Sequence, residues 1–338
     1  MTGNVPAEVL STHTAALFAA AVSRATELLR SGEVVALPTE TVYGLAANAL
    51  DAKAVAKIYE IKGRPAHNPI IVHVASSEMV KRCVTHWPEA ATQLARAFWP
   101  GPLTMVLPKA NDIPELVTAG GTTVGVRWPS HPFIQAVIRE CGFPLAAPSA
   151  NLSNQVSPTN ANHVRKQLGG KLPLIVDGGQ SQVGIESTVI DLATTPPRVL
   201  RPGMIHDESL VAVLGELGTG SVELATLRSP GLLRKHYSPR AKLRILSWRD
   251  TADLIRQLAT SNLQRSQAHV IAHTEIPSGE GMGGVSVIPH DAEAYARAIY
   301  AELHRCDEAG AGAIIVEALP EGVEWRAIAD RLNRAVAD

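Results

Sequence analysis

Residues 33–45 read EVVALPTETVYGL, and this stretch contains the pattern that decides the fold. Its first five residues form a short apolar run, which predicts a strand that ends at Pro38. The polar residues Thr39, Glu40 and Thr41 follow directly. Ligands of open α/β sheets bind at the carboxyl ends of strands, so these side chains are well placed for binding. A turn whose polar side chains cap the next element explains the run equally well.

Strand-like and helix-like segments alternate around this stretch. Residues 15–30 have a helical apolar rhythm, and residues 51–61 predict a second helix with Asp51 as its N-cap. Further strands are expected at residues 70–74, 103–107, 122–126, 144–147, 174–176 and 188–192, and helices at 88–98, 131–141 and 161–167. This order predicts an α/β fold with a twisted mixed sheet and flanking helices.

Length and composition indicate two globular domains. At about 150 residues per domain, 338 residues correspond to about two domains. A hydrophobic content of 46% with 19% charged residues excludes a largely disordered chain. No apolar run approaches the roughly 18 residues of a membrane span. Because no secretory signal is visible and the three cysteines are scattered, we expect a cytoplasmic protein without a disulfide framework.

The periodic pattern weakens between residues 215 and 241, which we interpret as an interdomain linker. This segment contains the basic run RKHY at residues 234–237. The rhythm then restarts, with strands expected at residues 242–248, 269–273, 285–288 and 313–318 and helices at 250–263, 292–308 and 323–333. The prediction is therefore one domain at residues 1–214, a linker at 215–241 and a smaller Rossmann-like α/β domain at 242–338.

The charge balance argues against a general affinity for polyanions. The net charge is −1 and the pI is about 6.9, so no global field attracts nucleic acid or an anionic membrane. Aromatic residues make up only 4% of the chain, which argues against a stacking platform for single-stranded nucleic acid. Any polyanion must therefore be held by local clusters.

One such cluster is Lys62-Gly63-Arg64, at the expected end of the helix over residues 51–61. Two cations at a helix C-terminus complement the helix dipole, with Gly63 as a left-handed cap. The same two cations also suit a phosphate clamp, because lysine supplies a point charge and arginine a planar fork. Both interpretations remain open for this segment taken alone.

Three more polar clusters follow strand-like runs, and each also has an ordinary explanation as a turn or a surface segment. They are APSANLS at 147–153, DGG at 177–179 followed by GIESTVID at 184–191, and RPG at 201–203. His73 lies in an apolar run, where a core histidine is the default. Standard phosphate-loop, dinucleotide, zinc-protease and hydrolase motifs are missing. The residues alone indicate an α/β protein that holds a phosphorylated ligand through a nonstandard site.

Taken together in this order, the segments resemble the YrdC-type family and, more specifically, the two-domain threonylcarbamoyl-adenylate synthases. The resemblance runs from about residue 33 to residue 205, through PTETVYGL, KGRPAHNPIIVH, WPGPLT, TVGVRWPSHP, APSANLSNQVSPT, DGGQSQVGIESTVID and LRPG. SPGLLRKHYSP is similar to the family's interdomain linker. The tail matches in size, position and rhythm. Ala46 is a departure, because many members have glycine there.

The resemblance implies that L-threonine, bicarbonate or CO2, and ATP react to give L-threonylcarbamoyl-adenylate and pyrophosphate. It implies Mg²⁺ carried by the ATP phosphates, with no metal site on the protein. Downstream proteins would transfer the group to the tRNA adenosine next to the anticodon. A monomer without membrane attachment is expected, and weak direct contact with tRNA is compatible with this function.

The family motifs also imply roles for individual residues of this chain. Lys62 and Arg64 are the expected catalytic residues, which hold the triphosphate. The ATP-binding residues implied are Lys62, Arg64, Asn68, Thr123, Ser149, Asn151, Ser157, Arg201 and Tyr237. The threonine-binding residues implied are Thr41, His73, Arg127, Ala147 and Ser187. The role of Tyr237 predicts that the linker closes over the site as a lid.

Two other functions use related domains. Enzymes that form carbamoyl-adenylate during hydrogenase maturation keep the fold, but they carry cysteine clusters and an acylphosphatase-like region that this sequence lacks. An RNA-binding or ribosome-assembly factor of the YrdC type needs excess basic charge and salt-sensitive affinity for RNA. The net charge of −1 argues against that role as the main function.

Overall fold

The computed structural model describes residues 6–218, 236–261 and 263–336 and divides the chain into two compact units. The first unit comprises residues 1–153 and 157–232, and the second comprises residues 154–156 and 233–338. Residues 219–235 of the expected linker, with Arg234 and Lys235 among them, lie outside the described residues. Within the described ranges, no helix is both long enough and apolar enough to cross a membrane.

The first unit is built around one ten-stranded sheet with the strand order β1-β8-β2-β3-β7-β4-β6-β5-β9-β10. Its strands are β1 (Glu8–Ser11), β2 (Val35–Leu37), β3 (Gly44–Asn48), β4 (Val72–His73), β5 (Leu103–Pro108), β6 (Thr123–Arg127), β7 (Leu145–Ala146), β8 (Leu174–Asp177), β9 (Thr188–Asp191) and β10 (Arg198–Arg201). Its helices are α1 (Ala15–Arg30), α2 (Ala52–Lys62), α3 (Ser77–Cys83), α4 (Glu89–Phe98), α5 (Pro132–Cys141), α6 (Ala161–Leu168) and α7 (Asp207–Leu214). The sheet contains both parallel and antiparallel pairs, which confirms the predicted mixed α/β class.

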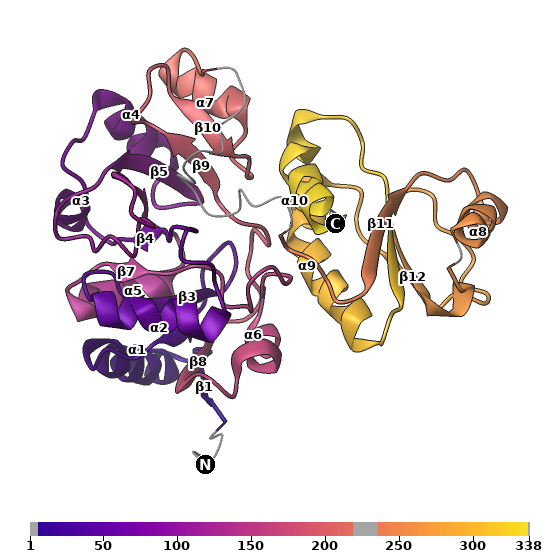
Figure 1. Ribbon diagram of the computed structural model, residues 1–338, viewed down its shortest axis with the longest axis horizontal. Coiled ribbons are helices and arrows are strands. Elements are labelled where there is room, and N and C mark those ends of the chain that lie inside the picture. Colours follow the sequence, from indigo (N-terminus) through magenta and orange to yellow (C-terminus); the bar gives the residue numbers. More distant parts are fainter. Residues whose placement is uncertain (1–5, 219–235, 262, 337–338) are drawn as a thin grey trace. The chain divides into compact units, whose positions relative to one another are not determined.

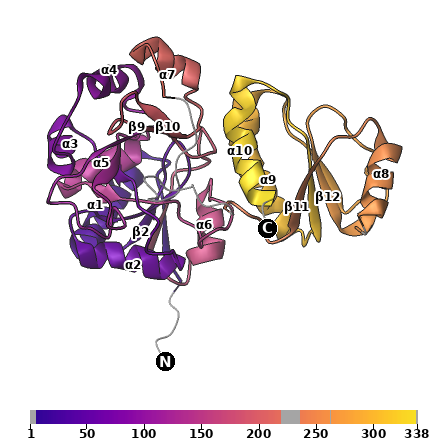
Figure 2. The same ribbon diagram turned by 45° about the horizontal axis from the view of Figure 1, so that its top comes forward.

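Both faces of this sheet are covered, and β2 shows why its sequence is apolar throughout. Val35 and Leu37 belong to the hydrophobic cluster that α1 and α5 cover, whereas Ala36 belongs to the larger cluster that includes residues of α2 and α4. Successive side chains of a strand point to opposite faces, so a strand covered on both sides needs apolar residues at every position. α1 and α5 pack against each other on their face (Figure 2).

The helix α2 begins and ends where the sequence predicts, and this fixes the position of Lys62. Asp51 Oδ1 accepts hydrogen bonds from the backbone N–H groups of Lys53 and Ala54, at 2.8 and 3.3 Å. Gly63 ends the helix in the left-handed conformation, with φ of 60°. Lys62 is therefore the last helical residue.

The second unit is a smaller α/β layer structure around a four-stranded parallel sheet, with the order β11-β14-β12-β13. Its elements are β11 (Lys242–Leu246), α8 (Thr251–Thr260), η1 (Arg265–Gln267), β12 (Ala268–Ala272), β13 (Gly284–Val287), α9 (Ala292–Glu308), β14 (Ala313–Glu317), η2 (Val323–Trp325) and α10 (Arg326–Val336). α9 and α10 cover one face of this sheet and α8 covers the other (Figure 1). This agrees with the Rossmann-like layering expected for the tail.

Gly203, in the RPG motif, is required by a close approach of two backbones. A Cβ atom at this position would lie 2.3 Å from the backbone N of Thr188 and 2.8 Å from the carbonyl carbon of Ser187. We therefore expect Gly203→Ala to lower the free energy of unfolding by about 1–3 kcal/mol, as overpacking does. The midpoint of urea denaturation measures this change. In the matched control Gly279→Ala, the nearest atom would be 3.9 Å away, and the midpoint should stay unchanged. Equal midpoints for both variants would contradict the prediction.

Candidate functional site

Lys62 is buried and holds the loop that follows β7. Its ammonium donates to the carbonyl oxygens of Ser149 at 2.5 Å and Asn151 at 2.6 Å, and to Asn151 Oδ1 at 3.3 Å. Burial, followed by the positive charge of Arg64, lowers the pKa of Lys62 well below its ordinary value. Three acceptors are nevertheless what an ammonium with three donors needs. The structure thus brings together Lys62, Ser149 and Asn151, all predicted from the sequence to bind ATP.

Arg64 fixes the loop that leads into β4. Its Nε donates to the carbonyl of Asn68 at 3.0 Å, and its Nη2 donates to the carbonyl of Pro69 at 2.6 Å. The helix-end interpretation of residues 62–64 is right for the backbone, because Gly63 is the left-handed cap. Both cations, however, are buried against carbonyl oxygens, whereas cations at an ordinary helix end are solvated.

A second group of predicted residues surrounds Arg127, the last residue of β6. Arg127 Nη2 lies 2.7 Å from Glu40 Oε1, and these side chains are 5% and 4% exposed. Arg127 Nη1 also donates to Thr41 Oγ1 at 3.0 Å. His73 is the register partner of Arg127 in the parallel pair of β4 and β6. The sequence-predicted threonine-side residues Thr41, His73 and Arg127 are thus neighbours.

Electrostatics in this group follow from burial and from Arg127. Burial alone would raise the pKa of Glu40, but the charge of Arg127 and hydrogen bonds from Arg127 and the Ser130 backbone together lower it. Burial, with Arg127 as a second cause, lowers the pKa of His73 to about 3. At neutral pH this site therefore holds a carboxylate, a guanidinium and an uncharged imidazole.

Several buried polar atoms here have no hydrogen-bond partner among the described residues. They include His73 Nδ1, Arg127 Nε and both polar side-chain atoms of Asn68. A buried polar atom without a partner costs about 1–3 kcal/mol, so native structures keep few of them. His73 and Arg127 end two neighbouring strands, and Asn68 lies in the loop before β4. Their unpartnered atoms indicate a site shaped for a polar ligand.

Arg201 and Ser187 form a third group, although the sequence predicts them on opposite sides of the site. Arg201 Nε donates to the carbonyl of Ser187 at 3.0 Å, and its Nη2 donates to Ser187 Oγ at 3.1 Å. Thr104 Oγ1 lies 2.9 Å from the same hydroxyl. Close by in sequence, Glu186 Oε1 accepts a hydrogen bond from Ser157 Oγ at 2.6 Å. The ATP-side and threonine-side residues thus meet at Ser187.

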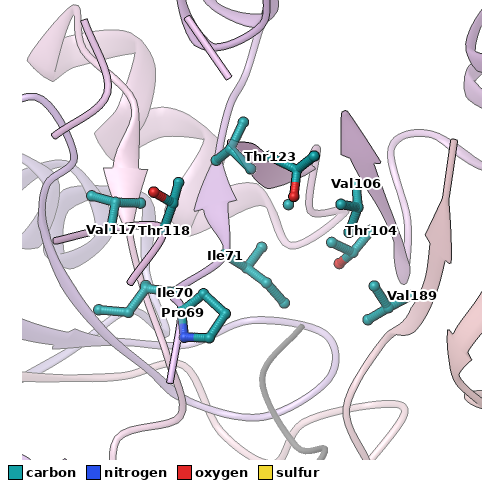
Figure 3. A pocket seen from close by; sticks show the side chains of 11 residues that line it. Pro69, Ile70, Ile71, Thr104, Val106, Val117, Thr118, Thr123 and Val189 are labelled. Carbon is teal, nitrogen blue, oxygen red and sulfur yellow. The ribbon is translucent and has the colours of Figure 1, made fainter. Parts of the chain in front are cut away.

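Thr123 lines a small hollow of about 10 Å³, which Figure 3 shows from close by. Thr104 and Thr118 supply two further hydroxyls, while Ile71 and Val106 contribute apolar walls. Thr104 links the lining of this hollow to the third group, because its hydroxyl contacts Ser187. A hollow of this volume is about the size of one water molecule.

Of the other predicted residues, Ala147 acts through its backbone and Tyr237 belongs to the second unit. Ala147 donates its backbone N–H to the carbonyl of Ile71 at 3.0 Å and so joins the Ser149 loop to the segment before β4. Tyr237 is a residue of the second unit, where its ring stacks on Tyr300 at 6.0 Å and lies 5.4 Å from the guanidinium carbon of Arg331.

Sequence reasoning assigned no specific role to the two buried carboxylates, Glu40 and Glu186. Both stand inside the quoted motifs, and a charged residue next to a buried strand was the available signal. Thr104 was also missed, because a threonine in an apolar strand is ordinary.

Comparison with known proteins identifies the family. Residues 27–203 match the Sua5/YciO/YrdC family model, described as telomere recombination, and residues 205–337 match the threonylcarbamoyl-AMP synthase C-terminal domain. The chain belongs to the Sua5/YciO/YrdC family.

Relatives of this Sua5-type chain are similar over nearly its whole length. The threonylcarbamoyl-AMP synthases of Pyrococcus abyssi and Bacillus subtilis are 39% and 41% identical to it. The first alignment covers 91% of both chains, and the second covers 93% of this chain and 92% of the relative. A crystal structure of P. abyssi Sua5 complexed with L-threonine is similar, with a TM-score of 0.86 and 38% identity over 93% of this chain and 94% of that one.

The buried Glu40–Arg127 pair yields a stability prediction. Glu40→Gln should lower the free energy of unfolding by about 3–5 kcal/mol at pH 7, because it leaves the Arg127 charge buried without its partner. Chemical denaturation measures the change. The control is Glu33→Gln, which breaks the 2.8 Å pair with Lys57, whose members are 43% and 40% exposed. That loss should stay below about 1 kcal/mol.

The same variant predicts a pH dependence. Because the pKa of Glu40 is lower in the folded state than its ordinary value of 4.5, its contribution is present above pH 4.5. That contribution is lost as the pH falls through the folded-state pKa. The stability difference between wild type and Glu40→Gln should therefore be largest at neutral pH and shrink in acid. An equal difference at pH 7 and pH 3 would contradict the ion pair.

Proposed function

We propose that the chain forms threonylcarbamoyl-AMP and pyrophosphate from L-threonine, bicarbonate or CO2, and ATP. Its relatives over more than nine-tenths of its length are threonylcarbamoyl-AMP synthases, so the chain is an enzyme of this class. The contacts of the segment 41–44 support the placement of the reaction. Its first residue contacts Arg127 and its last pairs with Ser149, so it joins the two polar groups within about 10 Å of chain.

The two groups suit the two substrates. The guanidinium of Arg127 matches the planar carboxylate of an amino acid, and Thr41 and the uncharged His73 add hydrogen-bonding atoms beside it. Lys62, Arg64 and Arg201 supply positive charge for a triphosphate, with hydroxyl and amide donors from Ser149, Asn151 and Ser157. We assign Asn68 and Thr123 to ATP as well, and Ala147 and Ser187 to threonine.

The chemistry requires positioning more than covalent catalysis. The threonine amine adds to CO2 to give a carbamate, and a carbamate oxygen then attacks the α-phosphorus of ATP with loss of pyrophosphate. Both reactants are anionic, so the buried cations lower their repulsion in the transition state. Mg²⁺ would be carried by the phosphates of ATP, whose oxygens are the hard donors that it prefers.

Further parts of the proposal concern the surroundings of the reaction. The adenylate would pass to separate proteins that modify the tRNA adenosine beside the anticodon. Tyr237 would close over the bound ATP as a lid. The protein would act as a monomer and make only weak contact with tRNA.

The deciding experiment is pyrophosphate release by purified protein with ATP and Mg²⁺, with L-threonine and bicarbonate added or left out. Release should require both, because the carbamate that attacks ATP forms from the two together. Release without threonine would indicate a different acceptor, and folded protein that releases none would contradict the proposal.

Lys62→Met tests whether the buried ammonium acts in the reaction or only anchors a loop. Turnover should fall at least about 100-fold, as when a donor to a developing charge is removed. The melting temperature should fall as well, because the Ser149 and Asn151 carbonyls lose their donor. Lys57→Met, on the same helix and paired with the exposed Glu33, should leave turnover unchanged. If the turnover of Lys62→Met stays within fivefold of wild type, Lys62 only anchors the loop that follows β7.

A further inference from the structure

A second pocket, of about 610 Å³, lies between α3 and α4 of the first unit. None of the residues that line it is among the candidate site residues. Its volume falls in the range of about 300–1,000 Å³ that is typical of small-molecule sites. The two helices lie next to each other in both views (Figures 1 and 2).

Tryptophan side chains are concentrated in the walls of this pocket. The chain contains five tryptophans, and Trp87, Trp99 and Trp128 all line this pocket. The ring centroids of Trp87 and Trp99 lie 5.9 Å apart at an interplanar angle of 43°. All three side chains are half-buried, so each rests on the core and also presents surface to the pocket. Indole surfaces of this kind bind flat aromatic rings by stacking.

The polar groups of the pocket are basic. Lys81, His86 and Arg96 line it, and no acidic residue of the described chain does. Glu78 lies within electrostatic reach of Lys81 but is not a lining residue. Aromatic walls with cations beside them match a ligand that is both flat and anionic.

The indole N–H groups of these tryptophans are either hydrogen-bonded within the chain or buried. Trp87 Nε1 donates to Thr92 Oγ1 at 3.0 Å, and Trp99 Nε1 donates to the carbonyl of Leu103 at 2.7 Å. Trp128 Nε1 is buried and has no hydrogen-bond partner among the described residues. The tryptophans therefore present ring surface to a ligand in the pocket.

We propose that this pocket binds a nucleotide, with its base against the tryptophans and its phosphate at Lys81 and Arg96. A nucleobase supplies the flat ring that stacks on the tryptophans. The phosphate supplies the negative charge that the basic residues require. A free nucleotide and a nucleotide of single-stranded RNA share this chemistry. The inference does not depend on the synthase reaction, because the two sites share no residue.

The test uses the full chain, titrated with uridine monophosphate and with an octamer of uridylate. Quenching of tryptophan fluorescence reports occupancy, because Trp248 and Trp325, the other two tryptophans, are buried in the second unit. Binding of at least one probe is expected. Lys81→Glu/Arg96→Glu should weaken it at least tenfold, and Trp128→Leu, which removes an aromatic ring from the pocket wall, at least threefold. Pyrophosphate release by Lys81→Glu/Arg96→Glu should stay unchanged.

The control Lys53→Glu/Lys242→Glu makes the same charge change at two exposed residues outside the pocket and should alter binding less than twofold. Equal binding of both probes per site assigns the pocket to free nucleotides, and much tighter binding of the octamer assigns it to RNA. The proposal is overturned if neither probe binds, or if binding ignores the pocket variants. It is also overturned if an acidic peptide binds in place of the nucleotides with the same variant dependence.

Discussion

The buried ion pair between Glu40 and Arg127 is the constraint on which the first unit depends. Its members come from the loop after β2 and from the end of β6, which are separated by three other strands in the sheet. Neither charge is stable in the interior alone, so the pair holds the loop in one position. The backbone of Thr41 then accepts a hydrogen bond from Gly184, and Tyr43 accepts one from Ala150. The walls of the site are therefore positioned from this one pair.

The other buried cations follow the same logic. The side-chain N–H groups of Lys62 and Arg201 donate hydrogen bonds to backbone and hydroxyl oxygens of the chain itself. Their positions are consequently set before any substrate arrives, which is the condition under which fixed charges lower a barrier most. A reaction between two anions is the kind of chemistry that gains from such an arrangement.

The sequence could predict what depends on local pattern. The apolar run before Pro38, the Asp51 cap and the Gly63 stop are local features, and the structure confirms all three. The strand β3, with the sequence GLAAN, was missed because small residues carry no strand periodicity and pairing with β2 and β7 decides its conformation. The Glu40 partner was hidden for a similar reason, since 87 residues of chain separate it from Arg127. The family motifs supplied the site residues that pattern could not.

The division of the chain has a consequence for how it can be taken apart. Residues 154–156 belong to the second unit, where Gln155 pairs with Ser238, although the chain on both sides of them belongs to the first. The two units are thus interlaced in sequence and have no single boundary between them. A fragment that ends before residue 233 would keep these three residues but lose the strand-like partner that holds them. Ser157 and the loop that carries Asn151 flank that segment. Removal of the tail therefore affects residues that lie next to the site in the sequence.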